Sequence, residues 1–253
     1  MRLQGRTAII TGAARSIGAT IAKRFAEEGA TVVVNDIAHA EHGRELVEEI
    51  RRAGGEAFFH QADVSLEADV LEMVGETIRR YGKVDILVNN AAIDPRKKWY
   101  EITSDEWDHI MNVNVKSQFL CAKAVFPSMK DNQYGKIINV SSITYFTGQA
   151  EFLHYVASKG AVVGFTRALA REVGAYGINV NCITPGAVWT ETEEEKVGAE
   201  ALIGIEDFLA ARQTFARRMN SSDLEGSFVF LASADSDFLT GQTINVDGGW
   251  IMH

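Results

Sequence analysis

The stretch TAIITGAARSIGATIAKRFAEEGATVVVND, residues 7–36, decides the fold of this chain. An apolar run over residues 7–11 precedes a glycine-containing turn, and the pattern over residues 17–28 is helical. A second run over residues 31–36 contains three consecutive valines, which make it apolar on both faces. Such runs are typical of parallel strands that are covered by helices on both sides. The stretch therefore predicts a strand, a helix and a second, parallel strand.

The same alternation continues along the chain. We expect a helix over residues 41–53, a strand over 57–61, a helix over 67–81 and a strand over 85–88. Two later helix starts are predicted by a hydroxyl residue followed three positions on by glutamate, as in a capping box: Thr103 with Glu106, and Ser222 with Glu225. This order predicts a doubly wound α/β architecture in one domain that spans residues 1–253.

The composition is that of a compact globular protein, with 46% hydrophobic and 23% charged residues. The net charge of −9 repels polyanions, so we expect neither nucleic acid nor an acidic membrane as a partner. Cys121 and Cys182 lack the paired spacing of a zinc or redox site, which predicts buried thiols in a reducing compartment and no metal. Because no apolar run has the length of a signal peptide or membrane span, we expect a soluble cytoplasmic protein.

One segment differs in composition from the rest, at about residues 190–218, where ETEEEKVGAEALIGIEDF is acidic and helical in pattern. It lies between the turn at Pro185 and Gly186 and the last helix and strand. We interpret it as a lid over a substrate cleft. The alternative is a solvated pair of surface helices without a functional role.

The turn after the first predicted strand contains Gly12 and Gly18, which would let the pyrophosphate of a dinucleotide approach the backbone at the start of a helix. Asp36 ends the second strand 24 residues after Gly12, where an acid would bind the ribose hydroxyls. Asp36 would repel a 2′-phosphate and therefore favours NAD. Arg15 would pair with that phosphate, so NADP remains the alternative cofactor.

Several short motifs, taken in order, resemble those of the short-chain dehydrogenase/reductase family. They are TGAARSIG from Thr11, NNAA from Asn89, NVNV from Asn112, INVSS from Ile138, YVASK from Tyr155, PGAVWT from Pro185 and GQTINVDGG near the end. The resemblance covers nearly the whole chain and implies a single Rossmann domain with a seven-stranded parallel sheet, assembled into dimers or tetramers. The family usually has glycine at the positions of Ser16 and Ala92. A serine at position 16 could cap the helix and donate to phosphate.

Tyr155 and Lys159 are four residues apart and therefore share one face of a helix. A free phenol has a pKa near 10. The nearby ammonium and a positive nicotinamide ring would together bring it toward the working range, so that Tyr155 could act as a general base. His154 would point to a different helix face, so we expect it to be structural or pocket-lining.

The resemblance assigns Ser142 as the hydroxyl that bonds the substrate oxygen, with Ser141 as the alternative. It assigns Asn114, rather than Asn112, to support a water beside Lys159. It also implies cofactor contacts, at Gly12, Arg15, Ser16, Ile17, Gly18, Asp36, Asp63, Val64, Asn90, Tyr155, Lys159, Ile183, Pro185, Gly186 and Thr190. Candidate substrate-pocket residues are Ile143, Thr144, Tyr145, Val188 and Trp189, with residues 94–99 at the rim.

Three functions are compatible with these residues. The first is reversible hydride transfer between a secondary alcohol and NAD, with an apolar or ring-bearing substrate, similar to aryl-alcohol and pyridoxal-type dehydrogenases. The second is NADP-dependent reduction of 3-ketoacyl thioesters, and the third is a non-catalytic cofactor-binding scaffold.

The cluster Arg96, Lys97 and Lys98 suggests a carboxylate-bearing hydroxy acid or a sugar acid as substrate, or else a solvated group of charges. We also expect a homotetramer, as the family implies, in which the helices over residues 107–129 and 155–173 pack across a twofold axis. The small residues Ala157, Gly160, Ala161 and Gly164 would allow the close approach.

Overall fold

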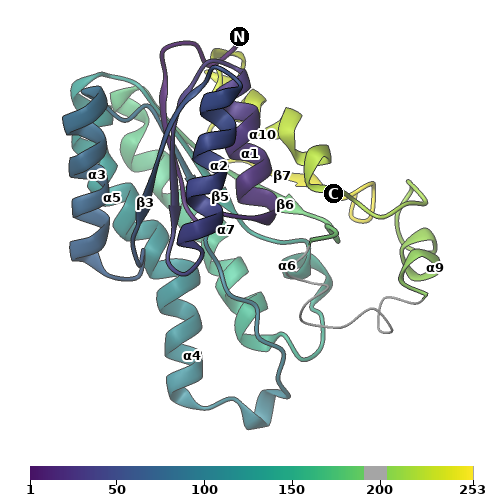
Figure 1. Ribbon diagram of the computed structural model, residues 1–253. Helices are drawn as coiled ribbons and strands as arrows, with labels where there is room; N and C mark the ends of the chain where they lie inside the picture. Colours follow the sequence, from purple (N-terminus) through teal and green to yellow (C-terminus); the bar gives the residue numbers. More distant parts are fainter. Residues whose placement is uncertain (191–203, 253) are drawn as a thin grey trace.

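A seven-stranded parallel sheet forms the centre of the computed structural model, which describes residues 1–190 and 204–252 (Figure 1). The strand order is β3-β2-β1-β4-β5-β6-β7. The strands are β1 (Thr7–Ile10), β2 (Thr31–Asp36), β3 (Glu56–Gln61), β4 (Ile86–Asn89), β5 (Gly135–Val140), β6 (Ile178–Pro185) and β7 (Thr243–Val246). This sheet confirms the predicted Rossmann-type α/β architecture.

Helices connect the strands. They are α1 (Ser16–Glu27), α2 (Ala40–Arg52), α3 (Glu67–Tyr81), α4 (Ser104–Met111), α5 (Ser117–Asp131), α6 (Thr144–Thr147), α7 (Leu153–Val173), α9 (Ile205–Ala210) and α10 (Glu225–Ala232). A π-helical segment, η2 (Asn112–Lys116), joins α4 to α5, and short 3₁₀ turns occur at η1 (Trp99–Glu101), η3 (Gly174–Tyr176), η4 (Ser221–Leu224) and η5 (Ala234–Ser236). The elements predicted from residues 7–88 agree with these bounds to within one residue at each end.

Two hydrophobic layers hold the helices on the sheet. Side chains of α1, α2 and α10 pack on the face that carries Ile10, and those of α3, α5 and α7 pack on the face that carries Ile9. Successive strand residues point to opposite faces, and both faces of β1 are fully buried, as its continuous apolar run predicts. Because β1 lies between β2 and β4, the strand order reverses there, and open α/β sheets bind ligands in the crevice outside the carboxyl ends of the strands at such a point.

One of the two predicted capping boxes is confirmed. The Thr103 hydroxyl accepts a hydrogen bond from Glu106 N, and the Glu106 carboxylate accepts one from Thr103 N. The predicted pair Ser222 and Glu225 is wrong. The chain enters a 3₁₀ turn two residues earlier, so Asn220 and Asp223 form the box there instead.

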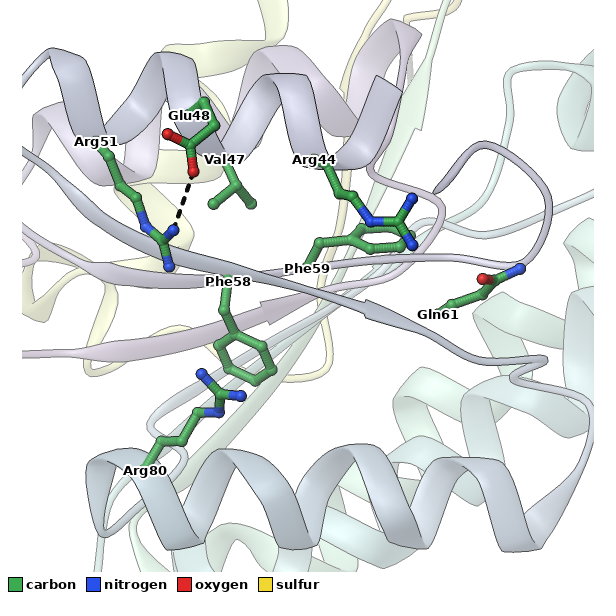
Figure 2. A pocket seen from close by; sticks show the side chains of 8 residues that line it. All are labelled: Arg44, Val47, Glu48, Arg51, Phe58, Phe59, Gln61 and Arg80. Atoms are coloured by element: carbon green, nitrogen blue, oxygen red, sulfur yellow. Dashed lines mark hydrogen bonds and ion pairs between the residues drawn. The ribbon is translucent and has the colours of Figure 1, made fainter. Parts of the chain in front are cut away.

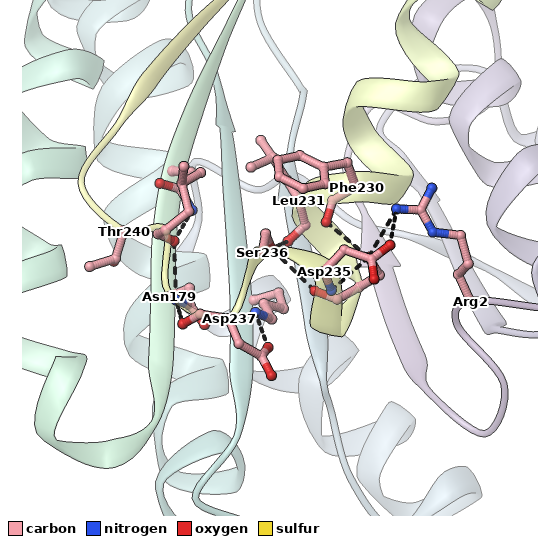
Figure 3. A network of polar contacts seen from close by, with 12 residues as sticks. Arg2, Asn179, Phe230, Leu231, Asp235, Ser236, Asp237 and Thr240 are labelled. Atoms are coloured by element: carbon pink, nitrogen blue, oxygen red, sulfur yellow. Dashed lines mark hydrogen bonds and ion pairs between the residues drawn. The ribbon is translucent and has the colours of Figure 1, made fainter.

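Polar contacts close the end of the sheet opposite the crevice. The buried Lys136 ammonium donates to Asn179 Oδ1 (2.8 Å) and to Asp237 Oδ1 (2.7 Å), and burial lowers the pKa of this lysine. Asn179 donates in turn to the Asp237 carbonyl (3.0 Å), and both residues lie near Thr240 in Figure 3. These bonds satisfy a buried cation at the amino end of β5.

The predicted lid falls partly on residues 191–203, which lie outside the described residues. Of its remainder, the Phe208 ring stacks edge-on against Trp250 at 5.9 Å, and Phe215 N donates to Gly248 O (3.0 Å). This part therefore packs on the C-terminal loop, and the lid stays a prediction. No helix in the described part of the chain is long and apolar enough to cross a membrane.

Candidate active site

The turn between β1 and α1, residues 11–18, leaves no room for side chains at its two glycines. A Cβ at Gly18 would lie 2.3 Å from Gly12 O and 2.7 Å from Ala13 Cα. Gly12 has a φ of +60°, and a Cβ there would lie 2.9 Å from Ala91 Cα. Helix, turn and neighbouring loop are thus in backbone contact, which is the fit that a pyrophosphate at the helix start requires. We call residues 11–18 the phosphate turn.

Ser16 does not cap α1, contrary to the prediction. Arg15, in extended conformation, occupies the cap position, and Ser16 is the first helical residue. Its φ of +54° lies in the left-handed region, which favours glycine. The usual family glycine at this position therefore has a backbone reason, and Ser16 adopts the same conformation at a cost of about 1 kcal/mol.

Asn90, the residue after β4, and Thr11, the first residue of the phosphate turn, hold the turn against the loop after β4. Asn90 Nδ2 donates to Thr11 O (3.0 Å) and Gly12 O (2.9 Å), and Thr11 Oγ1 accepts from Asn90 N and Ala91 N. The Asn90 side chain, predicted to contact the cofactor, thus contacts the backbone that would hold it. This role of Thr11 was not predicted, and the sequence signal for it is a hydroxyl residue directly before Gly12.

The Asp36 carboxylate lies buried at the end of β2, beside the phosphate turn. Its Oδ1 accepts from Ala38 N (3.1 Å) and His39 N (3.3 Å), and its Oδ2 makes a long bond with Ala14 N (3.4 Å). Oδ2 therefore keeps acceptor capacity for a ribose hydroxyl.

Asp63 and Val64 follow β3, where the adenine is expected. Asp63 Oδ1 accepts from both the backbone N and the hydroxyl of Ser65 (2.8 and 2.7 Å), so this carboxylate organises its own turn. Val64 is buried in the hydrophobic layer beneath α3. Ile17 packs partly buried against the layer beneath α1.

Of the two candidate serines, Ser142 faces the phenol. Ser141 is buried, and its hydroxyl donates to Lys159 O (2.8 Å). The Ser142 hydroxyl interacts with the Tyr155 hydroxyl and accepts from Thr144 N (3.2 Å). The side chains alternate after β5, so the two neighbours point to opposite sides.

Tyr155 and Lys159 face each other on α7, as their spacing predicts. The Lys159 ammonium lies 5.4 Å from the Tyr155 ring centre and donates to Val140 O (2.9 Å). Burial lowers the pKa of Lys159 to about 8, and the Asp94 carboxylate acts in the opposite direction. Burial also raises the pKa of Tyr155, with Ser142 lowering it and Asp94 raising it further. Within the chain alone, desolvation is thus the largest influence on the pKa of the phenol, and the expected lowering by the ammonium and a nicotinamide ring together stays a prediction.

Asn114 joins the loop after β4 to α7. The residue is buried in η2, where its Oδ1 accepts from Ile93 N and its Nδ2 donates to Ile93 O, both at 2.8 Å. Nδ2 also donates to Ser158 Oγ (3.0 Å). Asn112 is exposed. Single π-helical turns inside helices recur at functional sites, and here the turn directs Asn114 inward. Its predicted role in holding a water stays a prediction.

The predicted pocket residues differ in exposure. Ile143 and Val188 are buried, Thr144 donates its hydroxyl to Ser142 (3.0 Å), and Tyr145 and Trp189 are exposed. Ile183 and Pro185 are buried in β6, and a Cβ at Gly186 would meet Asp247 Cα at 2.8 Å. Thr190 is the last described residue before residues 191–203. His154 is buried on another face of α7, as expected, toward Lys97 and Glu106, and burial lowers its pKa.

Comparison with known proteins decides the family. A family model described as enoyl-(acyl carrier protein) reductase matches residues 12–251. The BbsD subunit of a hydroxy(phenyl)methylsuccinyl-CoA dehydrogenase from Thauera aromatica is 40% identical over 98% of both chains. A 3-oxoacyl-(acyl-carrier-protein) reductase, FabG, from Staphylococcus epidermidis is 36% identical over 98% of this chain and 99% of its own. The chain belongs to the short-chain dehydrogenase/reductase family.

A solved structure of a candidate gluconate dehydrogenase from Agrobacterium tumefaciens superposes on this short-chain dehydrogenase/reductase with a TM-score of 0.91. Its sequence is 33% identical, and the match covers 98% of this chain and 96% of the other. Family membership makes the protein an NAD(P)-dependent oxidoreductase that acts on CH–OH groups. The two glycines of the phosphate turn and the carboxylate of Asp36 fit such a dinucleotide.

An open groove of about 520 Å³ on this short-chain dehydrogenase/reductase lies away from Tyr155. It runs along β3 at the sheet edge, where Figure 2 shows Arg44 and Phe59 on one side of the strand and Phe58 and Arg80 on the other. Within residues 1–190 and 204–252, no group of histidine, cysteine or acidic side chains could hold a metal ion.

Proposed function

We propose that this protein is an NAD-dependent dehydrogenase that interconverts a secondary alcohol, apolar or ring-bearing, and its ketone. The observation that carries the proposal is the convergence of three side chains. The Ser142 hydroxyl interacts with the Tyr155 phenol, and the Lys159 ammonium lies 5.4 Å from the centre of that ring. This is the arrangement that proton transfer to and from a carbinol oxygen requires.

Each residue has one role in the proposed mechanism. Ser142 hydrogen-bonds the substrate oxygen and orients it toward Tyr155. The Tyr155 phenolate takes the hydroxyl proton, and Lys159 stabilises the phenolate charge. The bound nicotinamide supplies hydride acceptance. Asn114 keeps the loop after β4 against α7 and would position a water beside Lys159.

Two observations bear on the pKa of the base. Burial raises the pKa of Tyr155, whereas an opposite charge close to a phenol lowers it. A positive nicotinamide ring, if bound beside Tyr155, would therefore add to the stabilisation of the phenolate by Lys159. The proposal links deprotonation of Tyr155 to occupation of the site by NAD rather than to the protein alone.

The first test replaces the base. Tyr155→Phe should lower kcat by about 10²- to 10⁴-fold, while the Kd for NAD stays within about threefold because the phosphate turn is unaltered. Tyr81→Phe is the matched control, since Tyr81 is the last residue of α3 and its hydroxyl donates to Glu56 at the start of β3 (2.9 Å), the one hydrogen bond of that hydroxyl among the described residues. Turnover in Tyr155→Phe that equals that of Tyr81→Phe would exclude Tyr155 as the base.

The choice of NAD rests on Asp36, whose carboxylate would repel a 2′-phosphate. Asp36→Asn keeps an oxygen for the bonds from Ala38 N and His39 N and removes the charge. We expect the ratio of kcat/KM for NADP over NAD to rise at least tenfold, as loss of a close like-charge repulsion implies. Asp131→Asn, an exposed site at the end of α5, serves as the control. A wild-type preference for NADP would overturn the choice.

A second candidate is NADP-dependent reduction of 3-ketoacyl thioesters. It is favoured by Arg15 beside the phosphate turn, by the FabG relatives and by the thioester in the name of the BbsD relative. Assays of simple aryl alcohols, 3-hydroxyacyl-CoA and 3-ketoacyl thioesters with each cofactor separate the two candidates. Cofactor binding without turnover of any compound would favour a scaffold.

We further propose a cytoplasmic homotetramer. Cys121 and Cys182 are buried free thiols, which suit a reducing compartment. On α7, Ala157 and Gly164 are exposed, and Gly160 and Ala161 are half-buried, so a second copy could approach this helix closely. Trp107 and Phe119 add exposed apolar surface on α4 and α5. Light scattering should give about four times the chain mass of 27.8 kDa, and a monomer mass would refute the assembly.

A further inference from the structure

The loop after β4 is fixed at two points, one against Asn114 of η2, which in turn bonds Ser158 on α7, and one against Glu151, two residues before α7 begins. At Ile93, the backbone N and O both bond the Asn114 side chain at 2.8 Å. At Lys97, the backbone N donates to Glu151 O (2.9 Å). Arg96 lies between these points, so the backbone that carries it is held beside the helix of the catalytic tyrosine.

Arg96 reaches the surroundings of Tyr155 through a single aromatic ring. Its guanidinium carbon lies 5.1 Å from the centre of the Phe152 ring, and that ring packs edge-on against the Tyr155 ring at 5.6 Å. Phe152 is buried, whereas Arg96 is exposed. Stacking on the ring restricts the guanidinium while leaving its N–H donors accessible. A positive charge is therefore held about one aromatic ring away from the phenol.

The neighbouring charges distinguish Arg96 from the two lysines that follow it. Lys97 Nζ bonds both carboxylate oxygens of Glu106, at 2.6 and 2.8 Å, so its charge is already compensated. Arg96 makes no ion pair with any carboxylate of residues 1–190 and 204–252. Asp94 exerts its negative field on Tyr155 and Lys159, which disfavours an anion directly beside the phenol. An anionic group on a substrate is thus best placed near Arg96, on the side of the Phe152 ring that faces away from the phenol.

We propose that Arg96 binds a carboxylate of the substrate, and that the preferred substrates are ring-bearing hydroxy acids whose carboxylate lies about one ring away from the carbinol carbon. This inference rests on the proposed dehydrogenase function. Arginine matches a carboxylate with two parallel hydrogen bonds, which gives both affinity and orientation. In a chain with net charge −9, such a local cation also offsets the general repulsion of anions.

The test compares two substrates that differ by one charge, 4-(1-hydroxyethyl)benzoate and its methyl ester. Both carry the same carbinol and ring, so the ratio of their kcat/KM values reports the carboxylate. We expect wild type to favour the acid at least tenfold, and Arg96→Ala to lower the ratio about 10- to 100-fold, as loss of a charged hydrogen bond implies. Arg96→Lys should keep part of the preference. Lys98→Ala removes a neighbouring exposed charge and should change the ratio less than threefold.

Several results would overturn the proposal. Wild type that favours the ester, an unchanged ratio in Arg96→Ala, or an equal loss in Lys98→Ala would each contradict a specific carboxylate contact. Turnover of the ester with no preference for the acid contradicts the Arg96 contact alone. If wild type oxidises neither compound with NAD or NADP, the proposed function is in question. Calorimetric titration of 4-acetylbenzoate into the NAD complex then decides the contact, because equal affinity in wild type and Arg96→Ala would exclude it.

Discussion

Gly18→Ala tests whether the phosphate turn is as tightly packed as its geometry implies. The added methyl would lie 2.3 Å from Gly12 O, 2.7 Å from Ala13 Cα and 2.8 Å from Asn90 Nδ2. The first two atoms are backbone, and Asn90 is itself held by two bonds to that backbone, so none of them can yield cheaply. Overpacking of this kind costs about 1–3 kcal/mol, against a gain of up to about 1 kcal/mol from alanine's helix propensity.

With the full propensity gain, we therefore expect Gly18→Ala to destabilise the protein by up to about 2 kcal/mol, which lowers Tm by up to about 8 °C at this chain length. NAD binding should weaken at least tenfold, because Gly12 O and Ala13 must move. Gly75→Ala is the matched control, since Gly75 is also helical and its added Cβ would meet only the flexible end of Arg79, at 3.4 Å. Differential scanning calorimetry and NAD titration measure both effects. A Gly18→Ala protein with the Tm and NAD affinity of Gly75→Ala would refute the reasoning.

Two further predictions concern Ser16 and Lys159. Ser16→Gly should raise the free energy of unfolding by up to about 1 kcal/mol, because glycine removes the left-handed strain at φ +54°. Part of this gain is lost because glycine has a higher chain entropy in the unfolded state. Urea unfolding that shows a lower free energy of unfolding for Ser16→Gly would contradict this. For Lys159, the pKa in the folded protein is about 8, below its usual 10.5, so the unfolded chain binds more protons between these values and stability rises with pH across that window. The stability of wild type minus that of Lys159→Met should thus increase by about 3 kcal/mol from pH 7.5 to 10.5, and a flat difference would show that burial does not perturb Lys159.

The order of strands and helices was predictable because each element is indicated by the hydrophobic pattern of its own segment. Apolar runs such as 31–36 and helical patterns such as 67–81 each predict one element, and the structure reproduces both ranges. The proximity of Tyr155 and Lys159 followed from spacing, since residues 155 and 159 share a face of any helix, whereas the catalytic roles proposed for them came from the resemblance to the family. The choice between Ser141 and Ser142 needed the structure, because it depends on which neighbour turns toward Lys159 O.

Other features depend on contacts that sequence patterns do not encode. The π-helical turn around Asn114 has the same apolar pattern as an ordinary helix, and only the loop at Ile93 shows why it is widened. In the chain alone, burial by elements distant in sequence raises the pKa of Tyr155, an influence that its spacing to Lys159 does not reveal; the lowering expected from the ammonium and a nicotinamide ring together stays a prediction. The capping box before α10 lies two residues earlier than predicted, because a 3₁₀ turn that begins after Asn220 precedes α10.

The open groove along β3, which is lined by Arg44, Arg51 and Arg80 among others, bears on how two copies of this protein can associate. β3 is the terminal strand of the described sheet, and such strands invite pairing with strands from other molecules. Arg44 and Arg51 border it on one side and Arg80 on the other. A second copy that paired with this edge would have to desolvate Arg44 and the ion pairs of Arg51 with Glu48 and of Arg80 with Glu76, so these charged side chains disfavour the addition of a strand from another molecule.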